Sequence, residues 1–102
     1  MSKDLDVSYL NEIYGKLLTD RQREIVSQYF DYDLSLHEIA ENLGISRQAV
    51  LDTVKRACEQ LSLYEEVLGV YAAKKQVGYA LSDMENKRYS SAEERLKRLF
   101  NN

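Results

Sequence analysis

The chain of 102 residues contains no proline and no tryptophan, and only four glycines and one cysteine. Proline and glycine interrupt helices, so their scarcity favours long helices. A single cysteine cannot form an internal disulfide, which fits a reducing compartment. No apolar run approaches the roughly 18 residues needed to span a membrane, and Met1–Asp6 hold no apolar secretory segment. We therefore expect a cytoplasmic protein without a membrane partner.

The sequence also lacks the residue patterns of catalytic and metal sites. His37 is the only histidine and Cys58 the only cysteine, so no zinc-ligand spacing exists. There is no glycine-rich phosphate loop, no catalytic carboxylate pair and no nucleophile–histidine–acid set. The prediction is a protein that is not an enzyme, with no cofactor, no metal and no small-molecule substrate. We expect His37 at the surface and Cys58 as a buried, inert thiol.

The charge balance gives a mixed indication about nucleic acid. The net charge of −3 counts against simple attraction to phosphates. The charges are unevenly distributed, however: residues 31–42 carry four acidic and no basic side chains, whereas residues 43–58 carry three basic side chains and one acidic. The basic segment favours DNA, and the acidic total favours a protein or RNA partner.

The segment 34–57 has the pattern of two helices joined by a tight turn. Ser35 and Glu38 stand at capping-box spacing, and Ser46 can cap the second helix. Gly44 falls where the chain must leave the first helix with positive φ. Apolar residues recur at helical spacing, at Leu36, Ile39, Ala40 and Leu43 in the first helix and at Val50, Val54, Ala57 and Leu61 in the second. This pattern is typical of a helix-turn-helix, whose second helix enters the major groove of DNA.

Three segments carry a resemblance to a known family: Leu18–Ile25 (LTDRQREI), Leu36–Val50 (LHEIAENLGISRQAV) and Tyr64–Tyr71 (YEEVLGVY). Residues 19–57 resemble the region-4 helix-turn-helix of bacterial sigma factors. The whole chain is similar to the YlxM family of small bacterial helix-turn-helix proteins. The resemblance implies a DNA-binding regulator of transcription, linked by gene neighbourhood to the signal recognition particle pathway.

The expected fold is all-α: a helical bundle with a sigma region-4-like helix-turn-helix and a long C-terminal helical scaffold. We expect one domain over residues 1–102, with the helix-turn-helix module in 19–60 and a dimerisation segment in 61–102. A first helix is predicted over 8–18, and a second from a Thr19–Gln22 capping box to about Tyr32. A long helix starts at Ser46 and meets no stop signal before Gly69. A break near Leu81–Tyr89 precedes a last helix, which is capped by Ser90 or Ser91 and turns Phe100 inward.

The C-terminal half is apolar on two helix faces, which predicts a homodimer. A helix that is apolar on two faces must bury both, and a core of this size covers only one comfortably. One stripe comprises Leu61, Tyr64, Leu68, Tyr71 and Ala72; the other comprises Leu63, Val67, Val70, Val77, Leu81 and Met84.

The candidate DNA-binding residues lie mainly at the start of the helix that follows Ser46. Arg47 can contact guanine or phosphate and Gln48 can contact adenine, because bidentate donors match those base edges. Lys55 and Arg56, farther along the helix, are expected at phosphates. The remaining candidates are Leu51 for a thymine methyl, Asp52 for a cytosine amine, Ser46 at the helix start, and Arg21 and Arg23 for phosphates.

Simpler roles stay open for these residues. Arg47 and Gln48 could be a solvated helix start, and Arg56 could pair with a neighbouring acid. Asp20 and Glu24 could neutralise Arg21 and Arg23. The rival function is a protein- or RNA-interaction module of the signal recognition particle pathway that has the helix-turn-helix shape.

Overall fold

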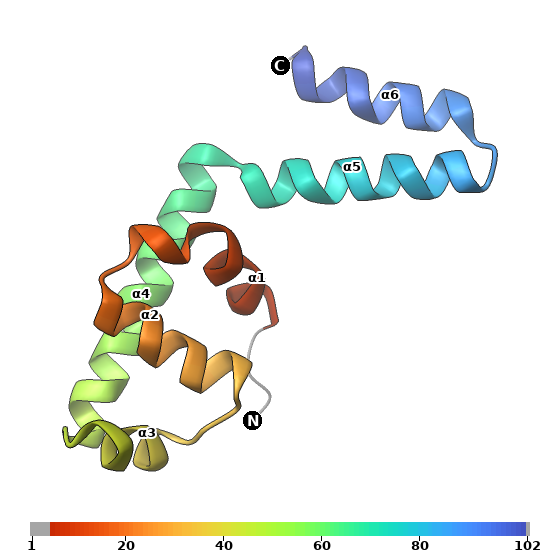
Figure 1. Ribbon diagram of the computed structural model, residues 1–102. Helices are drawn as coiled ribbons and strands as arrows, with labels where there is room; N and C mark the ends of the chain where they lie inside the picture. Colours follow the sequence, from red (N-terminus) through yellow and green to blue (C-terminus); the bar gives the residue numbers. More distant parts are fainter. Residues whose placement is uncertain (1–4, 102) are drawn as a thin grey trace. The chain divides into compact units, whose positions relative to one another are not determined.

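The computed structural model describes residues 5–101, and over this range the chain is helical and contains no strand (Figure 1). The α-helices are α1 (Leu5–Tyr14), α2 (Asp20–Val26), α3 (Leu36–Leu43), α4 (Arg47–Leu68), α5 (Val70–Glu85) and α6 (Tyr89–Phe100). The all-α prediction is confirmed. The chain divides at Leu68 and Gly69 into two compact units, which are described separately. A single domain over 1–102 stays a prediction.

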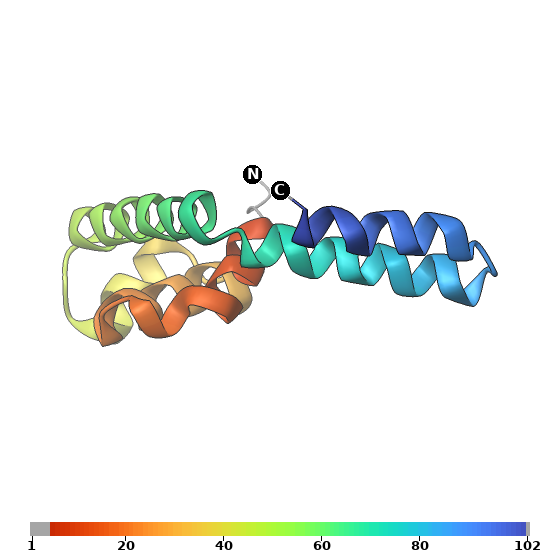
Figure 2. The same ribbon diagram turned by 90° about the horizontal axis from the view of Figure 1, so that it is seen from above.

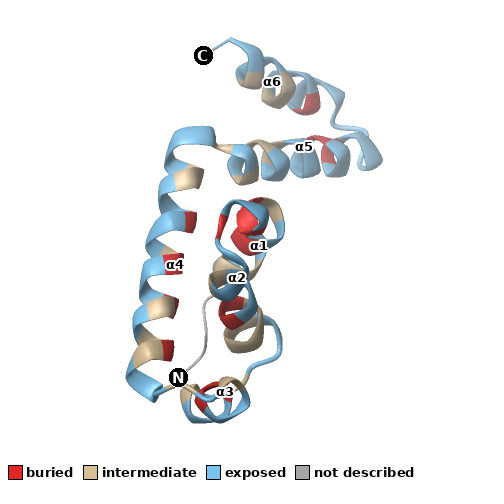
Figure 3. Ribbon diagram, turned by 60° about the vertical axis from the view of Figure 1, so that its left-hand side comes forward, coloured by how far each residue is buried: buried red, intermediate tan, exposed pale blue. Residues whose placement is uncertain are grey.

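The core of the first unit lies between α4 and the three helices before it (Figure 3). Ile25 from α2, Ile39 from α3 and Val50 from α4 have no solvent exposure and belong to one cluster. Because apolar residues recur at helical spacing, each of these helices presents a single apolar side to that cluster. The other side of α4 is left exposed along its length.

The helices before α3 differ from the predicted boundaries at their ends. α1 begins at Leu5 rather than at residue 8, and it tightens into a 3₁₀ turn over Gly15–Leu17. The capping box of α2 is confirmed: the Thr19 hydroxyl accepts from the Gln22 backbone N–H at 3.1 Å, and the Gln22 side chain accepts from the Thr19 N–H at 3.0 Å. The last turn before Tyr32 widens to a π-helix over Ser27–Asp31.

Two tyrosines tie the far end of α4 to the start of the chain. The hydroxyl of buried Tyr14 donates to Glu65 Oε1 at 2.7 Å, and the hydroxyl of Tyr64 donates to the Leu17 carbonyl at 3.4 Å. A buried hydroxyl needs a hydrogen-bond partner. Tyr64 and Glu65 open the segment 64–71, so this part of the sequence holds α1 and the 3₁₀ turn against α4.

The second unit is a helical hairpin in which α5 and α6 run antiparallel (Figures 1 and 2). Buried Ala80 and Ala92 allow the two helices to approach closely. The serine cap predicted for α6 is wrong: the helix already begins at Tyr89, and Arg88 precedes it without a side-chain cap bond. The inward Phe100 is also wrong, because its side chain is 85% exposed at the end of the helix.

Two glycines give a matched test of backbone conformation. Gly44 ends α3 with φ +67°, whereas Gly78 lies inside α5, and an added Cβ would contact nothing within 4 Å at either site. We expect Gly44→Ala to lower the free energy of unfolding by about 1–2 kcal/mol, because alanine is strained in the left-handed region. Gly78→Ala should raise it by about 0.5–1 kcal/mol. Urea denaturation followed by circular dichroism measures both, and equal signs would contradict this account.

Candidate nucleic-acid interface

The corner between α3 and α4 is built from local hydrogen bonds. Ser35 and Glu38 form a reciprocal capping box at the start of α3, with both hydrogen bonds at 3.1 Å. After Gly44, the Ile45 N–H donates to the Ala40 carbonyl at 3.1 Å. The Ser46 hydroxyl accepts from the Ala49 N–H at 3.0 Å and so caps α4. The predicted helix–turn–helix is therefore formed, and Ser46 is the residue that starts its second helix.

The first turns of α4 have a clear division between two sides. Val50 and Val54 are buried against α2 and α3. The predicted DNA-binding residues lie on the remaining surface of the helix: Ser46, Arg47, Gln48, Asp52, Lys55 and Arg56 are exposed, and Leu51 is half-buried. The core thus fixes the rotation of α4 about its axis, and that rotation leaves the polar candidates accessible.

The charged groups on this surface are unequally engaged. Gln48 Nε2 donates to Asp52 Oδ1 at 2.9 Å, so these two side chains already contact each other. A neutral amide does not cancel the carboxylate charge. Among residues 5–101, Arg47, Lys55 and Arg56 form no ion pair. Their positive charges are available to a ligand.

The two remaining candidate arginines, Arg21 and Arg23, lie on α2. Arg21 is exposed, and Arg23 lies 3.8 Å from Asp20 through Nη2 and Oδ1. The Asp20 side chain is fully exposed, so this pair contributes little to stability and can open easily. Both arginines can reach solvent, but they belong to a different helix from the residues that follow Ser46.

Comparison with known proteins identifies the family. A family model described as "Putative helix-turn-helix protein, YlxM / p13 like" matches residues 1–99. The chain belongs to this YlxM / p13-like family. A UPF0122 protein of Desulforamulus reducens is 45% identical over 80 residues, covering 78% of this chain and 68% of its own. A UPF0122 protein of Clostridium perfringens is 39% identical over 102 residues, covering all of this chain and 81% of its own.

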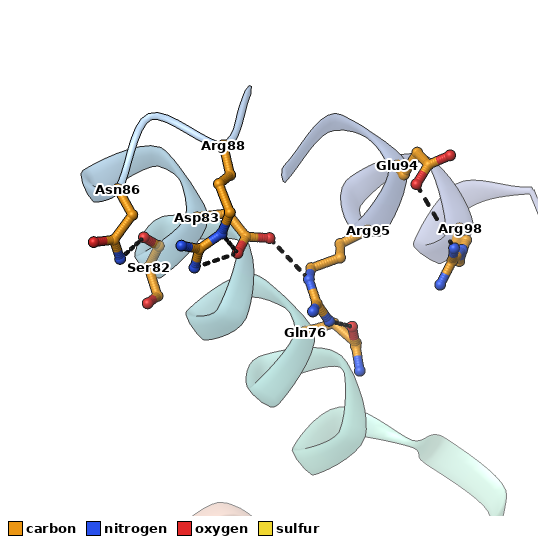
Figure 4. A network of polar contacts seen from close by, with 8 residues as sticks. All are labelled: Gln76, Ser82, Asp83, Asn86, Arg88, Glu94, Arg95 and Arg98. Carbon is orange, nitrogen blue, oxygen red and sulfur yellow. Dashed lines mark hydrogen bonds and ion pairs between the residues drawn. The ribbon is translucent and has the colours of Figure 1, made fainter. Parts of the chain in front are cut away.

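The YlxM / p13-like protein also contains a polar cluster that the sequence pattern did not reveal (Figure 4). The Asp83 side chain, only 7% exposed, accepts from Arg88 Nη2 and from Arg95 Nε, both at 3.0 Å. Arg95 also donates to Gln76 Oε1 at 3.2 Å. Burial of the carboxyl opposes ionisation, but hydrogen bonds from Arg95 and Arg88 and their positive charges outweigh it and hold the pKa of Asp83 below its ordinary value.

The sequence predicts a helix break over Leu81–Tyr89, whereas α5 continues to Glu85, so Asp83 lies inside the helix and faces α6. No local motif marks this arrangement, because Arg95 is twelve positions away on the next helix. The cluster fastens the hairpin of the YlxM / p13-like protein rather than forming a ligand site.

The structure also places the only histidine and the only cysteine of the sequence. His37 is exposed, as predicted, and its Nε2 lies 3.0 Å from Glu41 Oε1. Cys58 is half-buried beside the core cluster, so it is less buried than predicted. Over the described range, no group of three or more histidine, cysteine or acidic side chains could hold a metal ion. No helix within residues 5–101 is both long and apolar enough to cross a membrane.

Proposed function

We propose that this YlxM / p13-like protein binds double-stranded DNA, with α4 as the recognition helix in the major groove. The observation that carries the proposal is the set of exposed cations Arg47, Lys55 and Arg56, which follow the Gly44 corner and form no ion pair within residues 5–101. The N-terminal residues of a recognition helix reach base edges, and groups farther along meet phosphates.

The positions on α4 suggest a division of roles. Arg47 and Gln48 lie in the first turn and are assigned to bases, whereas Lys55 and Arg56 are assigned to phosphates. The Gln48–Asp52 hydrogen bond has to open before the Gln48 amide can contact adenine. Asp52 repels phosphate unless it accepts from a cytosine amine, so this pair favours sequence preference over tight general binding.

The proposed role is a regulator of transcription, and the family resemblance implies a link to the signal recognition particle pathway. We also propose that the protein acts as a homodimer in the cytoplasm. Two symmetry-related recognition helices would read half-sites about 34 Å apart, which is one turn of duplex.

Binding of a labelled generic duplex, measured by fluorescence anisotropy as the salt concentration is varied, tests the proposal. Each phosphate contact releases counterions, so three to five basic contacts should give a slope of log K against log[salt] of roughly −3 to −5. Selection from a random duplex pool then finds the preferred sequence. Absence of binding at about 50 mM salt, where electrostatic attraction is strong, would overturn the proposal.

The second candidate is a protein- or RNA-interaction module of the signal recognition particle pathway. The net charge of −3 favours the protein partner, since RNA carries the same phosphate charge as DNA. Such a module would use the same α4 surface on a structured RNA or on a protein. A protein that ignores duplex DNA at low salt but binds the particle's RNA or protein would support this candidate.

A further inference from the structure

We propose that a second copy of the chain packs on one side of the α5–α6 hairpin and completes a four-helix bundle. We call this side the hairpin face. It comprises Val70, Val77, Leu81 and Met84 of α5, and Tyr89, Leu96 and Phe100 of α6. The proposal concerns the self-association of the second unit and does not depend on DNA binding.

Helical spacing places these residues on one side of each helix. In α5 they are separated by seven, four and three positions, and in α6 by seven and four, which are the spacings of a single stripe. In each helix the stripe lies about a quarter turn from the residues that face the other helix, in the same rotational sense. Because the helices are antiparallel, equal offsets bring both stripes to the same side of the hairpin.

The hairpin face exposes more apolar side chain than the surface of a monomeric protein usually does. Its members other than half-buried Leu96 are between 40% and 85% exposed. Each partner contributes about 800 Å² to a standard interface, and exposed apolar residues of this number and size supply a large share of such an area. Contiguous apolar patches of that size mark interaction sites.

The hairpin also lacks the means to be stable by itself. The second unit comprises residues 69–102. Units shorter than about 40 residues usually need extra support to fold, such as oligomerisation. Within its described part, Ala80 and Ala92 are the buried hydrophobic residues. Beside them, Leu96 and Leu99 are half-buried, so the hairpin buries little apolar area and a further apolar contact would stabilise it.

The charges around the hairpin face fit a second copy in particular. Lys74 and Glu85 are exposed on the outer flank of the α5 stripe, one toward each end of the helix. A two-fold axis perpendicular to the helices brings α5 onto its partner copy in antiparallel orientation. Lys74 of each copy then lies near Glu85 of the other, so the flank is complementary to itself.

The opposite side of the hairpin is polar, which limits packing to one face. Lys75, Glu94 and Arg98 are exposed there, and Arg95 lies over the Tyr79 ring at 5.2 Å. Asp83, held by Arg88 and Arg95 between the helices, keeps α5 and α6 in register. The result is a rigid two-helix layer with one apolar side, for which the matching layer is a second identical hairpin.

Sedimentation equilibrium of the full chain at about 50 µM, without DNA, tests the proposal with a matched pair of variants. Leu81→Glu places a charge on the hairpin face, whereas Ser82→Glu adds the same side chain at the next position, on a different side of α5. We expect dimers for the wild type and for Ser82→Glu. Leu81→Glu should raise the dissociation constant roughly a hundredfold or more, because a buried charge in an interface centre removes a hot spot.

Circular dichroism shows whether each variant stays helical, and Phe100→Glu is the second variant if Leu81→Glu fails to fold. Phe100 makes little contact within its own chain, so its replacement should weaken the dimer and leave the helices intact. A monomeric wild type would overturn the proposal and leave the face to a different protein. A dimer that tolerates both face variants, or a loss of the dimer in Ser82→Glu, would equally overturn it.

Discussion

Replacement of Arg47 and Lys55 together by alanine is expected to lower the affinity for duplex DNA on the order of 100-fold, because each basic contact contributes about 1–3 kcal/mol. Both side chains are exposed on the same side of α4 and pair with no residue in the described range. The slope of log K against log[salt] should become shallower by about one unit, since Lys55 is assigned to a phosphate and Arg47 to a base. Fluorescence anisotropy titrations at several salt concentrations measure both effects.

The matched control removes the same two charges from the hairpin. Lys75 and Arg98 are exposed on its polar side. They belong to the second unit, whereas the first turns of α4 belong to the first. Lys75→Ala with Arg98→Ala should leave the affinity within about threefold, since the long-range effect of exposed charges is screened. If both double variants lost the same affinity, overall charge and not the α4 surface would govern binding.

Ile39→Ala is expected to lower the free energy of unfolding by about 2–5 kcal/mol, the usual range for deleting a large buried aliphatic side chain. Ile39 has no solvent exposure and packs in one cluster with Ile25 and Val50. Its loss therefore leaves a cavity where α2, α3 and α4 meet. Urea denaturation followed by circular dichroism gives the change.

Leu63→Ala is the control for Ile39→Ala, because Leu63 is an aliphatic residue of α4 that is 54% exposed. We expect a change within about 0.5 kcal/mol for this surface position. A loss of similar size at both positions would mean that the core does not lie where α3 meets α4. DNA binding of folded Ile39→Ala should also weaken, since α3 fixes how the start of α4 is presented.

Local rules of helix geometry made the helix-turn-helix predictable. Capping boxes depend on residues three positions apart, so Thr19 with Gln22 and Ser35 with Glu38 could be identified in the sequence and are formed as predicted. Gly44 and Gly69 both adopt positive φ at the ends of helices, as a residue without Cβ does readily. The stop of α4 at Leu68, one residue before Gly69, follows from the same rule.

Helix boundaries and end positions were less predictable where several signals compete. Serine caps helices well, so Ser90 or Ser91 predicted a helix start at residue 91 or 92. α6 instead begins at Tyr89, and the preceding Arg88 bonds to Asp83. Phe100 follows half-buried Leu99, but it lies on the hairpin face, about a quarter turn from the residues that face α5, and it stays exposed. Periodicity groups residues on a broad apolar side and does not specify which of them the neighbouring helix covers.

The sequence by itself determined the elements: an all-helical chain, the corner at Gly44, and the exposed start of α4 with Arg47, Gln48 and Lys55. These follow from interactions between residues within about four positions of each other. Only the tertiary structure decided that Asp83 joins Arg88 and Arg95, and that the apolar stripes of α5 and α6 fall on one side of a hairpin. The reason is that both depend on how two separate helices are rotated against each other, which no local pattern specifies.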